Sequence, residues 1–151
     1  MEIDHAKYMS FALEEARKSY LMNEVPVGAI IVMNGKIVAS SHNMPISKND
    51  PSSHAEINAI RIAAKKIRNY RLTGAKIYVT LEPCAMCFGA IIHSRIEELI
   101  FGAHDPKTGV CGTSENFKAL KCFNHQPRVV GGVLESESSN LLRKFFRDIR
   151  A

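Results

Sequence analysis

The chain has 151 residues, of which 46% are hydrophobic and 23% are charged. This size and apolar content predict one folded domain spanning residues 1–151 with a buried core. The first residues contain no basic segment followed by an apolar run, and no run of about 18 apolar residues occurs anywhere. We therefore expect neither secretion nor a membrane span.

The charge balance is basic, with 20 Lys and Arg against 15 Asp and Glu and a net charge of +5. Such an excess is compatible with a polyanionic partner, because clustered cations gain from counterion release on a phosphate backbone. The clusters could equally be solvated faces of helices. One group lies near the middle of the chain and one near its end: Lys65, Lys66, Arg68 and Arg71, then Arg143, Lys144, Arg147 and Arg150.

The first third of the chain predicts a helix followed by a hairpin. Apolar residues recur at helical spacing over 9–20 after a possible cap at Asp4. Residues 25–33 and 36–40 are expected to form two strands, because Asn34-Gly35 between them favours a tight turn. Prolines and polar residues over 43–53 predict a loop that leads into a second helix near His54.

The rest of the chain alternates between strand and helix. Residues 75–81 have the alternating, β-branched character of a strand, and Pro83 suits the start of the helix that follows. Further strands are expected at 99–102 and 128–133, and a closing helix at 138–150. This order predicts a three-layer α/β domain around a mixed sheet.

Two short motifs together predict a catalytic zinc site. His54, Cys84 and Cys87 supply one imidazole and two thiolates, a ligand set that suits zinc, and three protein ligands leave the fourth position open for water. Glu56 follows His54 by two residues. The pattern H-x-E followed by P-C-x-x-C is the signature of nucleobase deaminases, in which the glutamate transfers protons without coordinating the metal. The motifs therefore predict hydrolytic deamination of a nucleobase.

Each motif taken alone has another interpretation. Ser53 to Glu56 spells S-x-x-E before an apolar periodicity, which is also a capping box. The C-x-x-C pair could be a redox motif or half of a structural zinc site. No second pair completes a closed site, since Cys111 and Cys122 are far apart in sequence. With two cysteines on a metal and two free, the chain fits a reducing compartment, and we expect it in the cytoplasm.

The sequence resembles the bacterial tRNA-specific adenosine deaminases of the cytidine deaminase-like superfamily over nearly its whole length. The H-x-E and P-C-x-x-C motifs are common to the superfamily, whereas other segments resemble this branch. These are EVPVGA at 24–29, NMPI at 43–46, NYRL at 69–72, YVTLEPCAMC at 78–87, HSRI at 93–96, FGAHDPKTG at 101–109 and FFR at 145–147. The resemblance implies a three-layer α/β/α fold with a central mixed five-stranded sheet.

The resemblance also implies an activity, the conversion of adenosine to inosine at the wobble position of a tRNA anticodon, chiefly that of an arginine tRNA. One Zn²⁺ per subunit would activate water, and Glu56 would shuttle its proton to the base and then to the leaving amine. The implied substrate is the anticodon stem-loop, whose single-stranded bases can splay out for recognition. The implied assembly is a homodimer.

The resemblance assigns four substrate-binding positions. Asn43 would hydrogen-bond the flipped adenosine, the backbone around Ala55 would contact the base, Val27 would form a pocket wall, and Asp105 would touch the nucleotide backbone. Asn43 and Asp105 each precede a proline closely, so both could instead be turn residues.

Phosphate contacts are expected from Lys107 and from the basic group near the end of the chain, Arg143, Lys144 and Arg147. The family pattern after Gly109 continues toward G-S-L-x-N-L-L, whereas this chain has VCGTSENF at 110–117. Any family contact to the tRNA in this segment is therefore in doubt. His42 is interpreted as a structural residue, because a fourth ligand would occupy the position of the water.

Two other functions remain open. A free-base or nucleoside deaminase, acting on guanine or cytosine, would use the same zinc site in a closed pocket and would need no basic surface. A noncatalytic RNA-binding zinc module would keep the fold but has no use for the Glu56 carboxylate. Ammonia release with tRNA, with free purines or with neither distinguishes the three.

Overall fold

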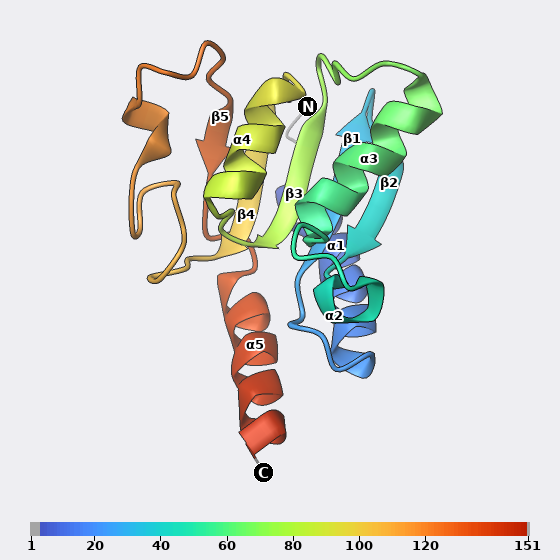
Figure 1. Cartoon of the computed structure of the whole chain (residues 1–151), viewed down its shortest axis with the longest axis vertical. Helices are drawn as coiled ribbons and strands as arrows, with labels where there is room; N and C mark the ends of the chain where they lie inside the picture. Colours follow the sequence, from blue (N-terminus) through green and yellow to red (C-terminus); the bar gives the residue numbers. More distant parts are fainter. Residues whose placement is uncertain (1–3, 151) are drawn as a thin grey trace.

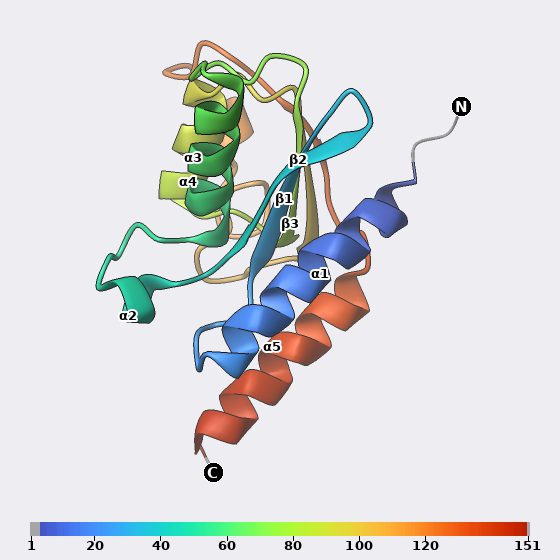
Figure 2. The same ribbon diagram turned by 90° about the vertical axis from the view of Figure 1, so that its right-hand side faces the viewer.

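The computed structural model describes residues 4–150, which form a five-stranded mixed sheet between two layers of helices (Figures 1 and 2). The strand order is β2-β1-β3-β4-β5. β1 is antiparallel to β2 and β3, whereas β3, β4 and β5 run parallel. The strands are β1 Gly28–Met33, β2 Lys36–His42, β3 Lys76–Leu81, β4 Glu98–Ala103 and β5 Arg128–Val130.

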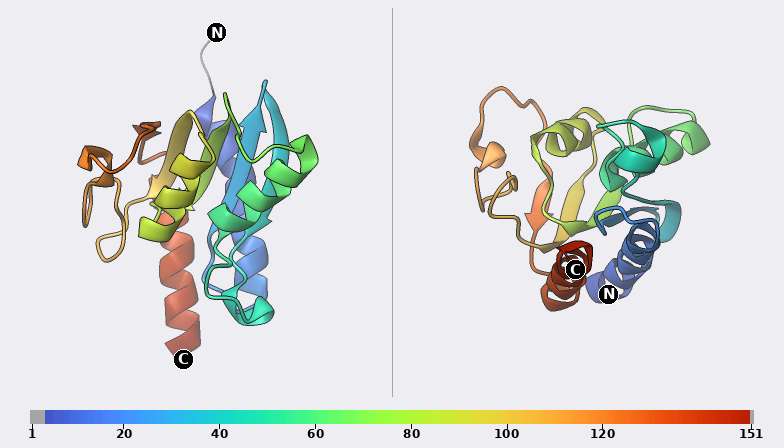
Figure 3. Two further views of the ribbon diagram at one scale, coloured as in Figure 1. Left: turned by 45° about the horizontal axis from the view of Figure 1, so that its top comes forward. Right: turned by 60° about the horizontal axis from the view of Figure 1, so that its bottom comes forward.

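Helices α3 and α4 cover one face of the sheet, and α1 and α5 lie side by side on the other (Figures 2 and 3). The three-layer α/β/α expectation is therefore confirmed. The helices are α1 His5–Leu21, α2 Pro45–Lys48, α3 Ala55–Ile67, α4 Ala85–His93 and α5 Glu135–Arg150, with a 3-10 turn at Phe117–Ala119. No helix among residues 4–150 is both long and apolar enough to cross a membrane.

The first helix and the hairpin form for local reasons that the sequence carries. The Asp4 side chain accepts a hydrogen bond from the Lys7 backbone at 3.0 Å and so caps α1. Asn34 and Gly35 have positive φ angles of 52° and 75°, as a two-residue hairpin turn between β1 and β2 requires. Both predictions are confirmed.

The core has two parts because both faces of the sheet are covered. On the α3 and α4 side it contains alanines of α3 and Phe88, Ile91 and Ile92 of α4. On the α1 side it contains Met9 and Tyr78. The central strands are consequently buried on both faces and read as apolar runs in the sequence. Gly28 lets α1 approach β1, since a Cβ there would lie 2.0 Å from the Ala12 carbonyl oxygen.

Several predicted boundaries were wrong. The expected loop at 43–53 contains the short helix α2, and β1 begins at Gly28, three residues later than predicted. β4 is longer than predicted by one residue at each end. β5 ends at Val130, because Gly131 and Gly132 follow and Gly132 has a positive φ of 86°. α5 begins at Glu135, three residues before the predicted start.

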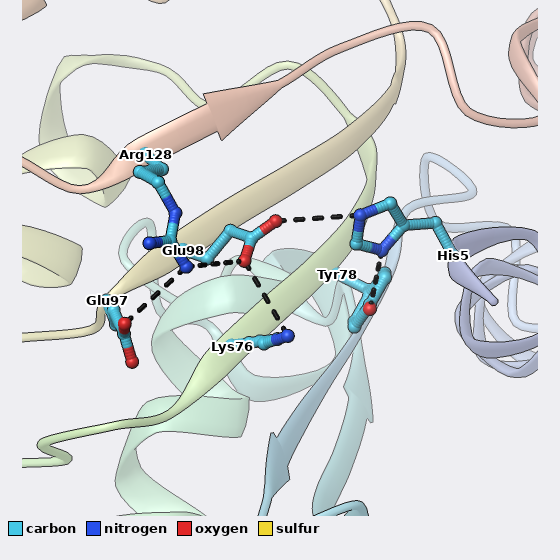
Figure 4. Close-up of polar contacts among 6 residues, drawn as sticks. All are labelled: His5, Lys76, Tyr78, Glu97, Glu98 and Arg128. Carbon is cyan, nitrogen blue, oxygen red and sulfur yellow. Dashed lines mark hydrogen bonds and ion pairs between the residues drawn. The ribbon is translucent and has the colours of Figure 1, made fainter. Parts of the chain in front are cut away.

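A cluster of charged residues closes one end of the sheet (Figure 4). The buried Glu98 carboxylate, at the start of β4, lies 3.2 Å from the Arg128 guanidinium, 3.7 Å from Lys76 Nζ and 3.5 Å from His5 Nε2. His5 Nδ1 is 2.8 Å from the Tyr78 hydroxyl. Because β3, β4 and β5 are parallel, this end is opposite the edge where α3 and α4 begin.

Candidate active site

The functional residues gather at one edge of the sheet. β2, β3 and β4 end at this edge and β1 begins there, so the residues flanking these strands come together, as is common in α/β sheets. Val27 precedes β1 and Asn43 follows β2. Glu82 follows β3 and Asp105 follows β4. The lower ends of α3 and α4 in Figure 1 meet the same edge.

His54 is the N-cap of α3 and has an extended backbone, with no side-chain capping bond. The hydroxyl of Ser53 is instead 3.1 Å from Asn58 Oδ1. The capping-box interpretation of Ser53 and Glu56 is therefore wrong, because neither side chain caps the helix. This leaves the His54 imidazole and the Glu56 carboxylate available for other roles.

Cys84 is the N-cap of α4, and Cys87 lies in the first turn of that helix. Pro83 directly precedes the N-cap, so the proline lies at the start of the helix, as predicted. Both cysteines face His54, with Cys84 Sγ 3.7 Å and Cys87 Sγ 3.4 Å from His54 Nδ1. Two separate helix starts therefore present their donors to one point.

This cluster fits a zinc ion. The three donor atoms lie within 4.8 Å of one another. Tetrahedral zinc with ordinary bond lengths holds a sulfur and an imidazole nitrogen about 3.6 Å apart, close to the distances found here. His54, Cys84 and Cys87 thus form a site that can hold one ion with a fourth position left over, as the sequence predicted.

The electrostatics of the cluster favour a thiolate at Cys84. The pKa of the Cys84 thiol is lowered to about 4, because Cys87 and His54 hydrogen-bond to it. The same bond and burial raise the pKa of Cys87 while no metal is present. The hydrogen bond to Cys84 also raises the pKa of His54. Because the ligands must lose these protons, metal binding here is coupled to proton release.

Glu56 lies beside the donors and is only 4% exposed. Burial raises the pKa of its carboxyl from 4.5 to about 7. It is not one of the three clustered donors. A buried acid that titrates near neutral pH next to an open metal position can both accept and release a proton.

A cavity of about 170 Å³ opens onto these residues. It has an apolar wall formed by Val25, Val27 and Leu81, and the other lining residues are polar. The polar lining residues are Asn43, His54, Glu56, Glu82, Cys84, Asp105 and Thr108. A small cavity with few polar groups and an apolar wall suits a flat aromatic base.

Asn43 is held in a defined orientation. Its Oδ1 accepts a hydrogen bond of 3.2 Å from the Ala55 backbone, and its own backbone carbonyl accepts one from Ser19 at 2.8 Å. The amide Nδ2 is left as a donor at the cavity. Ala55 does not line the cavity and its N–H is taken by Asn43, so a contact from Ala55 to the base stays a prediction.

Asp105 serves as a turn residue and also lines the cavity. Its carboxylate accepts hydrogen bonds from the Lys107 and Thr108 backbones and from the Thr108 hydroxyl. The turn interpretation is therefore confirmed, and a nucleotide contact stays a prediction. Lys107 lies outside the cavity, in an adjoining groove.

The adjoining groove has a volume of about 520 Å³ and shares four residues with the cavity, Val25, Leu81, Asp105 and Thr108. Its outer part is formed by the loop after β4 and by α5, which extends beyond the edge of the sheet (Figure 1). These outer residues are His104, Pro106, Lys107, Leu142, Arg143 and Phe146.

Of the three basic residues predicted on the last helix, Arg143 and Arg147 lie on one surface and Lys144 lies apart from them. Arg143 lines the groove, and Arg147 lies further along α5 beside Phe146 and Arg150. Lys144 instead lies over the Tyr20 ring of α1, with Nζ 5.4 Å from the centroid. His42 is half-buried with Nδ1 3.8 Å from Glu15 Oε2, which agrees with its interpretation as structural.

Sequence reasoning missed two buried glutamates at this edge, Glu24 and Glu82. Glu24 accepts hydrogen bonds from the Ile46 and Ser47 backbones at the start of α2. Glu82 accepts bonds from the loop after β4. The only signal in the sequence was an acidic residue next to an apolar strand run.

Comparison with known proteins agrees with this arrangement. Residues 3–150 match the family described as MafB19-like deaminase. A tRNA-specific adenosine deaminase of Bacillus subtilis is 48% identical over 143 residues, which cover 95% of this chain and 89% of that protein. The chain belongs to the tRNA-specific adenosine deaminase family. A Haemophilus influenzae protein of the same description is also 48% identical, over 95% of this chain and 84% of its own length.

Solved structures support the same family. One from a study of A-to-I editing by tRNA:A34 deaminases at the wobble position has a TM-score of 0.88 and 43% identity, covering 90% of this chain and 99% of its own. A guanine deaminase from Bacillus subtilis has a TM-score of 0.64 and 35% identity, covering 68% of this chain and 66% of its own. The likeness to the tRNA deaminase is thus the more extensive of the two.

Proposed function

We propose that this protein hydrolyses adenosine to inosine at the wobble position of a tRNA anticodon. The observation that carries the proposal is the buried, non-coordinating Glu56 beside a complete His54, Cys84 and Cys87 donor set, in a cavity that opens into a basic groove. The tRNA-specific adenosine deaminases at 48% identity supply the substrate class.

The residues divide the reaction between them. Zinc at His54, Cys84 and Cys87 would polarise a water molecule and so provide the nucleophile near neutral pH. Glu56 accepts a proton from the attacking water and passes it to the ring nitrogen next to the reacting carbon. Glu56 then takes the second water proton from the new hydroxyl on that carbon and delivers it to the exocyclic amine, which leaves as ammonia. Water supplies the new carbonyl oxygen, so the products are inosine and ammonia.

The cavity wall orients the base. Asn43 Nδ2 is a donor to an acceptor on the base edge, and Val27 packs against the ring. Both contacts are part of the proposal. The apolar wall also excludes bulk water, other than the attacking molecule, from the site, which strengthens the electrostatic interactions of Glu56.

A free-base deaminase is the second candidate, because a guanine deaminase shares the fold at 35% identity. The open side of the cavity favours RNA over a free base. The cavity continues into a groove lined by Lys107, Arg143 and Phe146, which can hold phosphates and stack a neighbouring base.

The deciding experiment is inosine formation on a transcribed arginine tRNA with adenosine at the wobble position, and on its isolated anticodon stem-loop. Free adenosine, cytidine and guanine are tested alongside, with Glu56→Gln as the inactive control. Conversion of the RNA alone supports the proposal. Conversion of a free base alone would contradict it while leaving the zinc chemistry in place.

The proposal extends to assembly and location. The family resemblance indicates a homodimer, and Ile62 of α3 and Met86 of α4 are exposed apolar side chains available for such contacts. Light scattering at micromolar concentration should give a mass near twice that of the chain. A cytoplasmic location follows from the proposed tRNA substrate.

A further inference from the structure

The backbone and the carboxylate of Glu82 are both held by hydrogen bonds that the deamination chemistry does not require. It follows β3 directly and is only 2% exposed. Its backbone N–H donates to the Ala103 carbonyl at 2.8 Å and so continues the pairing of β3 with β4. The pairing of β3 with β4 therefore fixes the position of the Glu82 backbone.

The Glu82 carboxylate binds the loop after β4 through backbone groups. Oε1 accepts a hydrogen bond from Asp105 N at 3.0 Å. Oε2 accepts bonds from Cys111 N at 2.9 Å and Thr113 N at 3.3 Å. One carboxylate thus joins Asp105 to two donors that lie six and eight residues further along the loop.

Within residues 4–150 the Glu82 carboxylate has no ion-pair partner, so these three bonds are its compensation for burial. Both oxygens are engaged, which leaves Glu82 poorly placed to transfer a proton. Its geometry is that of a residue that holds the loop in place through hydrogen bonds.

The loop packs closely against the Glu82 carboxylate. A Cβ at Gly109 would lie 2.4 Å from Glu82 Cδ and 2.6 Å from the Asp105 carbonyl oxygen. The loop also carries Asp105 and Thr108 into the cavity and Lys107 into the groove. A shift of the Glu82 carboxylate would therefore displace Asp105, Thr108 and Lys107, which line the cavity and the groove.

We propose that Glu82 is a positioning residue that sets the 105–113 loop against the RNA substrate. The inference rests on the proposed function and deepens it, since it assigns the placement of Asp105, Lys107 and Thr108 to one buried carboxylate. The donors are backbone N–H groups, so these hydrogen bonds do not depend on which side chains stand at 111 and 113. The unusual sequence after Gly109 is therefore compatible with an ordered substrate loop.

The test is Glu82→Gln, which keeps size and shape but turns one acceptor oxygen into an NH₂ donor. That donor faces a backbone N–H, so one side of the loop is released. We expect KM for the anticodon stem-loop to rise about tenfold, with kcat within about twofold and zinc still at one per chain. A lower kcat with KM unchanged would overturn the inference.

Glu98→Gln is the matched control, because Glu98 is another glutamate under 10% exposed, at the opposite end of the sheet (Figure 4). The variant loses a buried carboxylate and its ion pairs, but residue 98 does not contact the 105–113 loop. We expect a lower melting temperature with KM unchanged. An equal rise of KM in Glu98→Gln would overturn the inference, since the effect would then be general destabilisation.

Gly109→Ala is a second variant that keeps the Glu82 charge while displacing its carboxylate. It should raise KM as Glu82→Gln does, and the double variant should be no worse than the worse single one, because both act on one contact. Additive effects, or an unchanged KM in both variants of an active enzyme, would overturn the inference. Failure of the wild type to convert the stem-loop would instead overturn the proposed function, and the inference with it.

Discussion

Asn43 Oδ1 accepts a hydrogen bond of 3.2 Å from the backbone N–H of Ala55, the residue between His54 and Glu56. This bond joins the loop after β2 to the start of α3 at the point where a metal ligand and the proposed proton shuttle are two residues apart. It also settles the amide orientation, because only the oxygen can accept from an N–H. The Asn43 amide nitrogen is consequently the group that the proposed contact with the base would use.

Asn43→Asp separates these two roles. The variant keeps an acceptor for Ala55 N but loses the donor to the base. We expect zinc content and melting temperature close to wild type, and kcat/KM for the stem-loop lower by about tenfold to a hundredfold. Asn43→Ala should in addition lower the melting temperature. Full activity in Asn43→Asp would exclude a contact from Nδ2 to the substrate.

Glu56→Gln should abolish turnover while zinc stays bound. The amide is nearly isosteric but cannot accept the proton of the attacking water, and general acid–base groups contribute about a hundredfold to ten-thousandfold in rate. Inosine formation and metal content are measured on the same preparation. Substantial turnover by zinc-loaded Glu56→Gln would contradict the assigned role.

The same variant should show a pH-dependent gain in stability. Burial raises the pKa of Glu56 from 4.5 to about 7, so the folded zinc-free protein binds this proton more tightly than the unfolded chain. Glu56 therefore destabilises the fold increasingly as pH rises from 4.5 to 7, by about 3 kcal/mol above that range. Urea unfolding of both zinc-free proteins should give a difference that widens over this interval. A constant difference would contradict the raised pKa.

Cys84→Ser should reduce zinc to well below one ion per chain, because a hydroxyl replaces a thiolate whose pKa is already lowered to about 4. Cys122→Ser is the control, since Cys122 is exposed and outside the donor cluster. Metal analysis after dialysis compares the two. Chelation of the wild type should remove activity, and added zinc should restore it.

Arg143 and Arg147 should contribute to RNA affinity through charge. Replacing both with Ala should weaken stem-loop binding and lower the slope of log K against log salt concentration by about 0.7 to 0.9 for each phosphate that is no longer neutralised. Lys144 should matter less, because it lies over Tyr20. Lys36→Ala, in the hairpin at the far end of β1, is the charge control. An unchanged slope in the double variant would show that Arg143 and Arg147 of α5 do not contact the RNA phosphates.

Local sequence signals predicted the parts of the fold that depend on neighbouring residues. The Asp4 cap and the Asn34-Gly35 turn each act within a few residues and were confirmed. The metal site was predicted because each half of its motif has a recognisable local spacing, although His54 and Cys84 are 30 residues apart. The alternation of strands and helices likewise led to the right layers. These features need no knowledge of distant contacts.

Two of the features that the sequence did not predict depend on distant contacts. α2 forms with its first backbone N–H groups bound to Glu24, which is more than twenty residues away. The role of Glu82 depends on donors between 23 and 31 residues further along the chain. Such partners carry no local pattern, so an acidic residue beside a strand gives no sign of what it will bind.

The attachment of the 105–113 loop through its main chain has a consequence for divergence. The bonds that place the loop are made by backbone groups, so the exposed Thr113 can change without their loss, whereas Gly109 and Glu82 cannot change freely and Cys111 is buried in the core. Substitutions at exposed positions of this segment can therefore accumulate while the loop stays attached to the catalytic edge of the sheet. A library randomised at Thr113 and at Lys107, which lines the groove, would test whether this loop sets the sequence context that is edited.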